Sequence, residues 1–166
     1  MNRIALITGA TSGIGEACAR KFAGSGYDLV LTGRNKEKLE AMKAELEGVE
    51  VTTLAFDVRD RKAAQEALDS LTGRWRDIDV LVNNAGITRD GLLMRMGDDA
   101  FDRVLDVNLK GTFNMTRALT KTFMRQRGGC VVNMSSVVGL MGNAGQANYA
   151  ASKAGVIGLT LSLIHI

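Results

Sequence analysis

Two side chains near the end of the chain have types and a spacing that suit proton transfer. Tyr149 and Lys153 are four residues apart, so on a helix they share one face. An ammonium beside a phenol favours the phenolate form, which suits the phenol to protonate a carbonyl being reduced, or to deprotonate an alcohol being oxidised. Taken alone, the pair is equally typical of an exposed helix surface.

Two further polar residues could complete a catalytic set. Ser136 follows the apolar segment 130–134, and its hydroxyl could hold the carbonyl oxygen and stabilise the charge that develops there. Asn108 lies within a long helical region, where it could anchor a water that links Lys153 to solvent. Each has an ordinary alternative, which for Asn108 is a hydrogen bond on the helix surface. Their occurrence together, in one chain order, favours a common site.

A glycine-rich turn follows the first apolar segment of the chain. Residues 8–15 read Thr-Gly-Ala-Thr-Ser-Gly-Ile-Gly, and glycine allows a backbone to approach an anion without a Cβ in the way. The helix that follows would point unpaired N–H groups at that anion. A tight turn without a ligand is the alternative. We expect a phosphate-binding loop for a dinucleotide, formed by Gly9, Thr11, Ser12, Gly13, Ile14 and Gly15.

The end of the second apolar segment indicates which dinucleotide binds. Sites that prefer NAD usually place an acidic residue there to bind the ribose hydroxyls. This chain has Arg34, whose guanidinium suits a 2′-phosphate. We therefore expect NADP(H) as the cofactor, with a solvated loop arginine as the alternative.

Two more segment ends are candidates for cofactor contacts. Asp57 and Val58 follow the third segment, where the carboxylate could accept a hydrogen bond from an adenine amino group or could cap the helix that begins near Asp60. Residues 83–86, Asn-Asn-Ala-Gly, follow the fourth. There the small Ala85 and Gly86 and the amide of Asn84 would allow a ribose to approach, and Asn83 could tie neighbouring strands together. An ordinary asparagine-rich turn is the alternative.

These residues must be positioned by alternating strands and helices. Residues 13–23, for example, place Ile14, Ala17, Cys18 and Phe22 at helical spacing. Short crossovers between strands that are apolar on both faces require a doubly wound parallel sheet, an α/β fold in which ligands bind at the carboxyl ends of the strands. The expected strands are residues 3–8, 28–33, 49–56, 78–82 and 130–134, and the expected helices are 13–23, 36–47, 61–71, 98–126 and one beginning near 148.

Composition narrows the class of protein. The 166 residues carry a net charge of +3 with 5% aromatic residues, and no basic run is present, which gives no support for nucleic-acid binding. No apolar run approaches the roughly 20 residues that span a membrane. Two cysteines and one histidine, His165, leave little for a disulfide framework, a metal site or a Ser-His-Asp triad. We expect one cytoplasmic domain.

The motifs together resemble those of the short-chain dehydrogenase/reductase family. The matching segments are TGATSGIG, NNAG, the Asn of DVNLKG, the Ser of SSVVG, and YAASK. The resemblance covers residues 3–160 and implies a Rossmann-type fold and an NAD(P)-dependent oxidoreductase. It also implies that Asn108, Ser136, Tyr149 and Lys153 are catalytic, and that Lys153 holds the nicotinamide ribose.

Within the family, the two halves of the chain resemble different groups. Residues 83–160 are similar to bacterial 3-oxoacyl-(acyl-carrier-protein) reductases, whereas residues 1–82 are also similar to NADP-dependent, serine-type hydroxy-amino-acid dehydrogenases. The first resemblance implies reduction of a 3-oxoacyl thioester on an acyl carrier protein during fatty-acid elongation. The alternatives are oxidation of a small hydroxy acid with NADP, and an inactive fragment with an exposed sheet edge.

Length is the largest departure from the family, whose members run to about 240–250 residues. We expect residues 1–160 to form an incomplete dinucleotide-binding domain, ending after the fifth strand and its helix, and residues 161–166 to be a foreign tail. Cys130 and Ser12 stand where carrier-protein reductases often have basic residues. Members are usually tetramers, and the helices at 98–126 and from 148 onward would allow at least a dimer.

Overall fold

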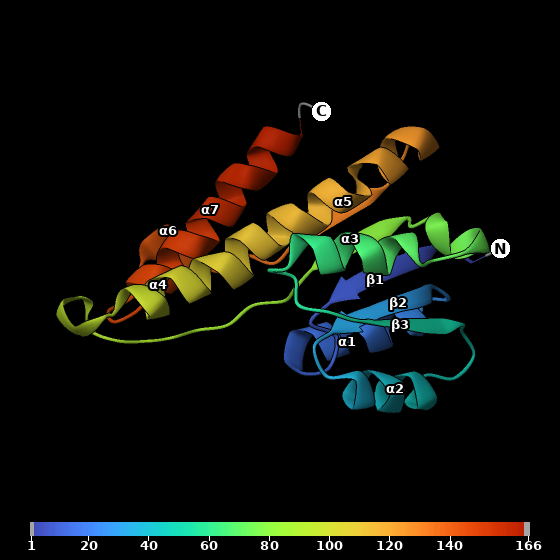
Figure 1. The fold of residues 1–166 in the computed structure, drawn as a ribbon, viewed down its shortest axis with the longest axis horizontal. Helices are drawn as coiled ribbons and strands as arrows, with labels where there is room; N and C mark the ends of the chain where they lie inside the picture. The colour runs from blue at the N-terminus through green and yellow to red at the C-terminus, as the bar shows by residue number, and fades with distance from the viewer. Residues whose placement is uncertain (1, 165–166) are drawn as a thin grey trace.

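The computed structural model describes residues 2–164 and contains one five-stranded parallel sheet (Figure 1). The strand order is β3-β2-β1-β4-β5, so the chain moves outward from β1 to β3 and then returns to the other side of β1. This reversal confirms the doubly wound arrangement. The strands are β1 (Ile4–Thr8), β2 (Asp28–Gly33), β3 (Val51–Ala55), β4 (Val80–Asn83) and β5 (Cys130–Asn133).

Helices follow the strands as the sequence predicts, with small differences in their bounds. They are α1 (Gly13–Ala23), α2 (Lys36–Glu45), α3 (Arg61–Asp69), α4 (Asp98–Leu105), α5 (Gly111–Gln126), α6 (Val138–Met141) and α7 (Ala147–Leu163), with 3₁₀ turns at Gly73–Arg76 and Leu93–Arg95. The sequence did not indicate the short α6 or the 3₁₀ turns. The expected long helix at 98–126 is continuous, but a π-helical turn at Asp106–Lys110 separates α4 from α5.

The core lies on both faces of the sheet because the side chains of β1 alternate between them. Ile4 and Leu6 pack with residues of α3 and α5, whereas Ala5 and Ile7 pack with residues of α1 and α2. Figure 1 shows α1 and α2 on one side of the sheet and α3 and α5 on the other. The ends of the central strands are therefore held rigidly between two layers of helices.

The buried face of α1 differs from the predicted one. Ile14 and Ala17 are exposed, and the buried positions are Gly15 and Ala19. A Cβ at Gly15 would lie 2.2 Å from the carbonyl oxygen of Gly9, so the first turn of the helix packs directly against the preceding loop. This contact rotates the helix so that Ile14 faces outward.

The last strand forms a sheet edge. Cys130 and Val132 of β5 are exposed, because no element of the described chain covers this side of the strand. The expectation that every strand is buried on both faces is therefore wrong for β5. Helix α7 continues through residues 161–163 of the expected tail. Residues 165 and 166, including His165, lie outside the described residues. Between residues 2 and 164, no helix has both the length and the apolar character needed to cross a membrane.

A buried ion pair closes the amino-terminal end of the sheet. The Asp28 carboxylate accepts hydrogen bonds from Arg74, from the Glu50 amide at 2.7 Å and from Asn2 at 3.3 Å. Burial alone would raise the pKa of the Asp28 carboxyl, but these hydrogen bonds outweigh it and hold the pKa below its usual value. The folded state therefore prefers the ionised carboxylate.

Replacing this carboxylate tests the contribution of the pair to stability. Because the pKa of Asp28 is depressed by folding, its contribution is present above the unfolded value near 3.8 and is lost as pH falls below it. Asp28→Asn should lower the free energy of unfolding by about 1–3 kcal/mol at pH 7. In this variant the free energy of unfolding should also fall less steeply as the pH is lowered from about 5 to about 3. Urea unfolding at several pH values measures both effects. Glu50→Gln, which alters an exposed partner of Arg74, should change little, and an equal loss in both variants would contradict this account.

Candidate active site

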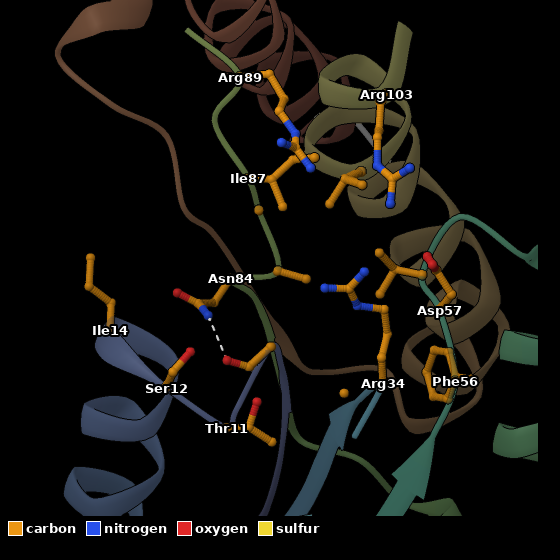
Figure 2. Close-up of a pocket in the computed structure, with 16 residues that line it drawn as sticks. Thr11, Ser12, Ile14, Arg34, Phe56, Asp57, Asn84, Ile87, Arg89 and Arg103 are labelled. Atoms are coloured by element: carbon orange, nitrogen blue, oxygen red, sulfur yellow. Dashed lines mark hydrogen bonds between the residues drawn. The ribbon is translucent and has the colours of Figure 1, made fainter. Parts of the chain in front are cut away.

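A cavity of about 380 Å³ opens at the carboxyl ends of the central strands (Figure 2). Most of the predicted cofactor residues line it: Gly9, Thr11, Ser12, Ile14, Arg34, Asp57, Val58, Asn84, Ala85 and Gly86. Gly13 and Gly15, in the first turn of α1, do not line the cavity. Tyr149 and Lys153, the other two predicted cofactor residues, lie outside its lining, on α7.

The glycine-rich loop is held against β4 by close backbone packing. Gly9 has a φ of +64°, and a Cβ there would lie 2.9 Å from the Cα of Ala85. The Asn84 amide donates to the carbonyl oxygens of Thr8 and Gly9 at 3.1 and 3.2 Å. Thus Asn84 fastens the loop to β4 with its amide nitrogen, a role that the sequence reasoning did not assign to it.

The loop has the features required to hold a phosphate. Gly13 has a φ of +57° with open space where a Cβ would be, and the Ser12 side chain makes no capping hydrogen bond to α1. The first amides of a helix have no intrahelical acceptor, and the helix dipole favours an anion there. The cavity and its loop therefore fit the pyrophosphate of a dinucleotide.

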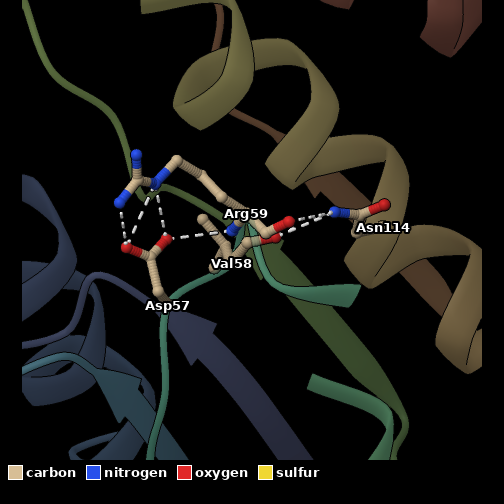
Figure 3. A network of polar contacts seen from close by, with 4 residues as sticks. All are labelled: Asp57, Val58, Arg59 and Asn114. Atoms are coloured by element: carbon tan, nitrogen blue, oxygen red, sulfur yellow. Dashed lines mark hydrogen bonds and ion pairs between the residues drawn. The ribbon is translucent and has the colours of Figure 1, made fainter. Parts of the chain in front are cut away.

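Asp57 is paired with its neighbour rather than free in the cavity. Its carboxylate accepts from the Arg59 backbone amide at 2.9 Å and from the guanidinium at 2.9–3.1 Å (Figure 3). The Arg59 hydrogen bond is the main reason that the pKa of Asp57 lies below its usual value. The alternative that Asp57 caps α3 is wrong, because the side chain of Asp60 accepts the amides of the first turn.

The turn that carries Asp57 and Val58 is also fastened to α5. The buried Asn114 amide donates to the carbonyl oxygen of Val58 at 3.0 Å and to that of Arg59 at 3.4 Å (Figure 3). Asn83, as predicted, ties neighbouring strands together, since its amide donates to the Asn133 side chain of β5 at 2.8 Å. Buried amides thus fix the strand ends that surround the cavity.

Asn108 lies at the π-helical turn and is 1% exposed. Its side-chain oxygen accepts from the Ile87 amide at 2.8 Å, and its amide donates to the Ile87 carbonyl and to the Ser152 hydroxyl, both at 3.0 Å. The alternative of a hydrogen bond on the helix surface is therefore wrong. Asn108 connects the extension of β4 to the helix that carries Tyr149, because Ser152 donates onward to the Tyr149 carbonyl at 2.8 Å.

Tyr149 and Lys153 face the same side of α7, as the sequence predicts. The Lys153 Nζ lies 5.7 Å from the centroid of the Tyr149 ring and donates to the Met134 carbonyl at 2.5 Å. Burial lowers the pKa of the Lys153 ammonium. The ammonium is held between the end of β5 and the phenol ring, close enough to interact with both.

Ser136 lies in the segment between β5 and α6. Its hydroxyl oxygen accepts from the Val138 amide at 3.2 Å in the short α6, and the neighbouring Ser135 donates to the Lys153 carbonyl at 2.9 Å. Within residues 2–164, no hydrogen bond joins Ser136 to Tyr149. The segment that carries Ser136 is therefore fastened to α7 by the neighbouring Ser135 hydroxyl.

Two arginines that line the cavity were missed by the sequence analysis. Arg89 follows the Asn-Asn-Ala-Gly segment, and Arg103 belongs to α4. Figure 2 shows both side chains reaching into the cavity from the wall opposite the glycine-rich loop. No sequence signal marks Arg103, because its four-residue spacing to Val107 points to the cavity only once the structure has placed Val107 in the lining.

The fold and the site together are those of the dinucleotide-binding domain of an oxidoreductase, with a tyrosine and a lysine on one face of a helix. The sequence model of the short chain dehydrogenase family matches residues 3–165, and the chain belongs to this family. It is 48% identical over 160 residues to a 3-oxoacyl-(acyl-carrier-protein) reductase FabG of Thermotoga maritima, covering 95% of this chain and 65% of the relative.

Other relatives have similar sequence identities and coverages. A reductase of the same name from Staphylococcus aureus is 47% identical over 165 residues, covering 98% of this chain and 67% of the relative. Nodulation protein G of a Rhizobium species is 49% identical over 161 residues, covering 97% and 65%. The chain spans about two thirds of the length of the curated relatives it matches.

The contact between Gly15 and Gly9 can be tested directly. Gly15→Ala should lower the free energy of unfolding by about 1–3 kcal/mol and weaken dinucleotide binding, because the added Cβ would displace the loop. Gly158→Ala, at a helical position with open space, is the matched control and should stabilise by up to about 1 kcal/mol. Thermal unfolding with and without NADPH measures both properties. Normal stability and binding in Gly15→Ala would show that the loop does not need this packing.

Proposed function

We propose that this chain carries the cofactor-binding and catalytic residues of an NADPH-dependent reductase that converts a 3-oxoacyl thioester to the 3-hydroxyacyl thioester. The observation that carries the proposal is the placement of Lys153 5.7 Å from the Tyr149 ring, at a strand end next to a cavity that fits a dinucleotide. The similarity to reductases with 3-oxoacyl-(acyl-carrier-protein) in their names supports this substrate class.

Each catalytic side chain has a role in this reaction. A bound nicotinamide dinucleotide supplies the hydride that reduces the ketone carbon. Tyr149 donates a proton to the carbonyl oxygen, and the Lys153 ammonium stabilises the phenolate that remains. The Ser136 hydroxyl donates a hydrogen bond to the carbonyl oxygen. Its proton is available for this while its oxygen accepts from the Val138 amide. Asn108 holds the Ile87 backbone and α7 together through its side chain.

A preference for NADP(H) over NAD(H) is part of the proposal. Arg34 is exposed at the end of β2 and lines the cavity, and Figure 2 shows its guanidinium pointing inward. The carboxylate expected in an NAD-preferring site is absent from this position. A guanidinium is a favourable partner for a 2′-phosphate because it can donate two parallel hydrogen bonds.

The acyl group is proposed to arrive on an acyl carrier protein, an acidic partner. Of the two arginines near the exposed Cys130, Arg125 is already paired with Asp77 at 2.8 Å. Arg127, at the carboxyl end of α5, forms no ion pair within the described residues. This region therefore offers less positive charge than the sequence alone suggests. The proposal that an acyl carrier protein delivers the substrate is supported instead by the similarity to the relatives.

Removing the phenolic hydroxyl tests the proposed chemistry. Tyr149→Phe should reduce the NADPH-dependent reduction of acetoacetyl thioester by about 10²–10⁴-fold, because the proton donor is lost. NADPH binding, followed by fluorescence, should change by less than about twofold. Tyr27→Phe, a change at a distant tyrosine that packs against Phe22, is the matched control and should remain active.

Two results would contradict the proposal in different ways. Turnover of serine or another small hydroxy acid with NADP, without reduction of the thioester, would favour the alternative substrate class. If NADPH failed to raise the melting temperature of the wild-type chain, the chain would lack the binding site, which is the result expected of an inactive fragment.

We also propose that the chain associates with a second copy through α5 and α7. Two shallow clefts meet between these helices, around the half-exposed Phe113 and the apolar Leu109, Leu159 and Leu163. Burying this apolar surface in a symmetric dimer would remove it from water.

A charge placed in this surface should separate the copies. Phe113→Glu should shift the sedimenting species toward the 17.8 kDa monomer, because association would remove a charged carboxylate from water. Met124→Glu, an exposed position farther along α5, is the control. The same mass for both variants and the wild type would argue against this interface.

A further inference from the structure

The cavity carries more positive charge than its acidic residues can balance. Three arginines line it, Arg34, Arg89 and Arg103, and they come from the end of β2, the segment after β4, and α4. Asp57 is the only acidic residue in the lining, and both of its oxygens already accept from Arg59. Among residues 2–164, no carboxylate lies within 4.0 Å of the three guanidiniums. Unpaired like charges around one cavity favour an anionic ligand.

Arg34 and Arg103 face each other across this cavity. Figure 2 shows Arg34 reaching inward from the end of β2 and Arg103 reaching toward it from α4, with Asp57 to one side. Arg89 lies beside Ile87. A phosphate has oxygens on all sides, so two guanidiniums on opposite walls can donate to it together.

The helical backbone that carries Arg103 is held in place by contacts on both sides of this residue. Val104 is fully buried, and the next turn contains Asn108 with its hydrogen bonds to Ile87. The Ala100 carbonyl, one turn earlier, accepts from the buried Asn148 at 3.1 Å. Because α4 is held at both ends, Arg103 projects from a rigid base, and only its side chain has to order when a ligand binds.

We propose that Arg103 is a second cofactor-specificity residue, which contacts the 2′-phosphate of NADP(H) from the wall opposite Arg34. This inference rests on the proposed preference for NADP(H). Sequence reasoning places this specificity in the glycine-rich loop and at the end of β2. The proposal adds a residue of α4, which lies outside both. Recognition then requires two elements on either side of the cavity, and a dinucleotide without the 2′-phosphate engages neither guanidinium fully.

The test compares 2′,5′-ADP with 5′-AMP, two ligands that differ by the 2′-phosphate, using calorimetry on the whole chain. Arg103→Ala should raise the Kd of 2′,5′-ADP by about tenfold and that of 5′-AMP by less than about twofold, because a charge-assisted contact to the phosphate is lost. Arg103→Lys should lose less, since it keeps the charge. Arg95→Ala is the matched control, because Arg95 is an exposed arginine between β4 and α4 that does not line the cavity. This variant should bind both ligands as the wild type does.

The outcomes distinguish this inference from the proposed cofactor. If Arg34→Ala weakens 2′,5′-ADP selectively and Arg103→Ala does not, the role of Arg103 is overturned while the NADP(H) preference stands. An equal loss for both ligands in Arg103→Ala would also overturn it, because the guanidinium would then be stacking on the adenine ring. If wild-type protein binds the two ligands equally, the preference for NADP(H) fails, and this inference fails with it.

Discussion

The side chain of Asn108 holds the two halves of the candidate site together. It pairs with both backbone groups of Ile87, as a neighbouring strand would, and also donates to Ser152 on α7. The cavity lies on the Ile87 side and the Tyr149–Lys153 pair on the Ser152 side. Because an unpartnered buried amide costs about 1–3 kcal/mol, this arrangement is strongly preferred once the surrounding helices have packed. Asn108 itself lies within the π-helical turn between α4 and α5, a kind of turn that is frequent at functional sites.

The sequence predicts the order of the elements well because apolar periodicity reports directly on strands and helices. It also predicts that Tyr149 and Lys153 share a face, since a four-residue spacing on a helix requires it. It fails where tertiary contacts decide. Ile14 has helical spacing with Cys18 but is exposed, because Gly15 packs against the loop instead. Asp57 does not cap α3, because Asp60 lies closer to the first turn and Arg59 occupies the carboxylate.

The cavity arginines show a different limit of sequence reasoning. Arg34 is recognisable because it follows a strand, where ligands of doubly wound folds bind. Arg103 lies in the middle of a helix, and its relevance depends on how α4 is rotated. That rotation is set by Val104 in the core and by the hydrogen bond between Asn148 and the Ala100 carbonyl, both long-range contacts. A charged residue on an amphipathic helix is normally a solvated one, so only the structure separates Arg103 from the exposed arginines of the chain.

The environment of Lys153 links stability to the proposed chemistry. Burial lowers the pKa of its ammonium, which means that the fold disfavours the charge in the absence of a partner. The Met134 carbonyl compensates in part by accepting a hydrogen bond at 2.5 Å. The same loss of water strengthens the attraction between the ammonium and any negative charge that develops beside it. An ammonium in solvent would carry no desolvation cost but would act on the phenol through a screened interaction. Burial of Lys153, which is 6% exposed, is therefore the arrangement that makes the ammonium effective beside the phenol.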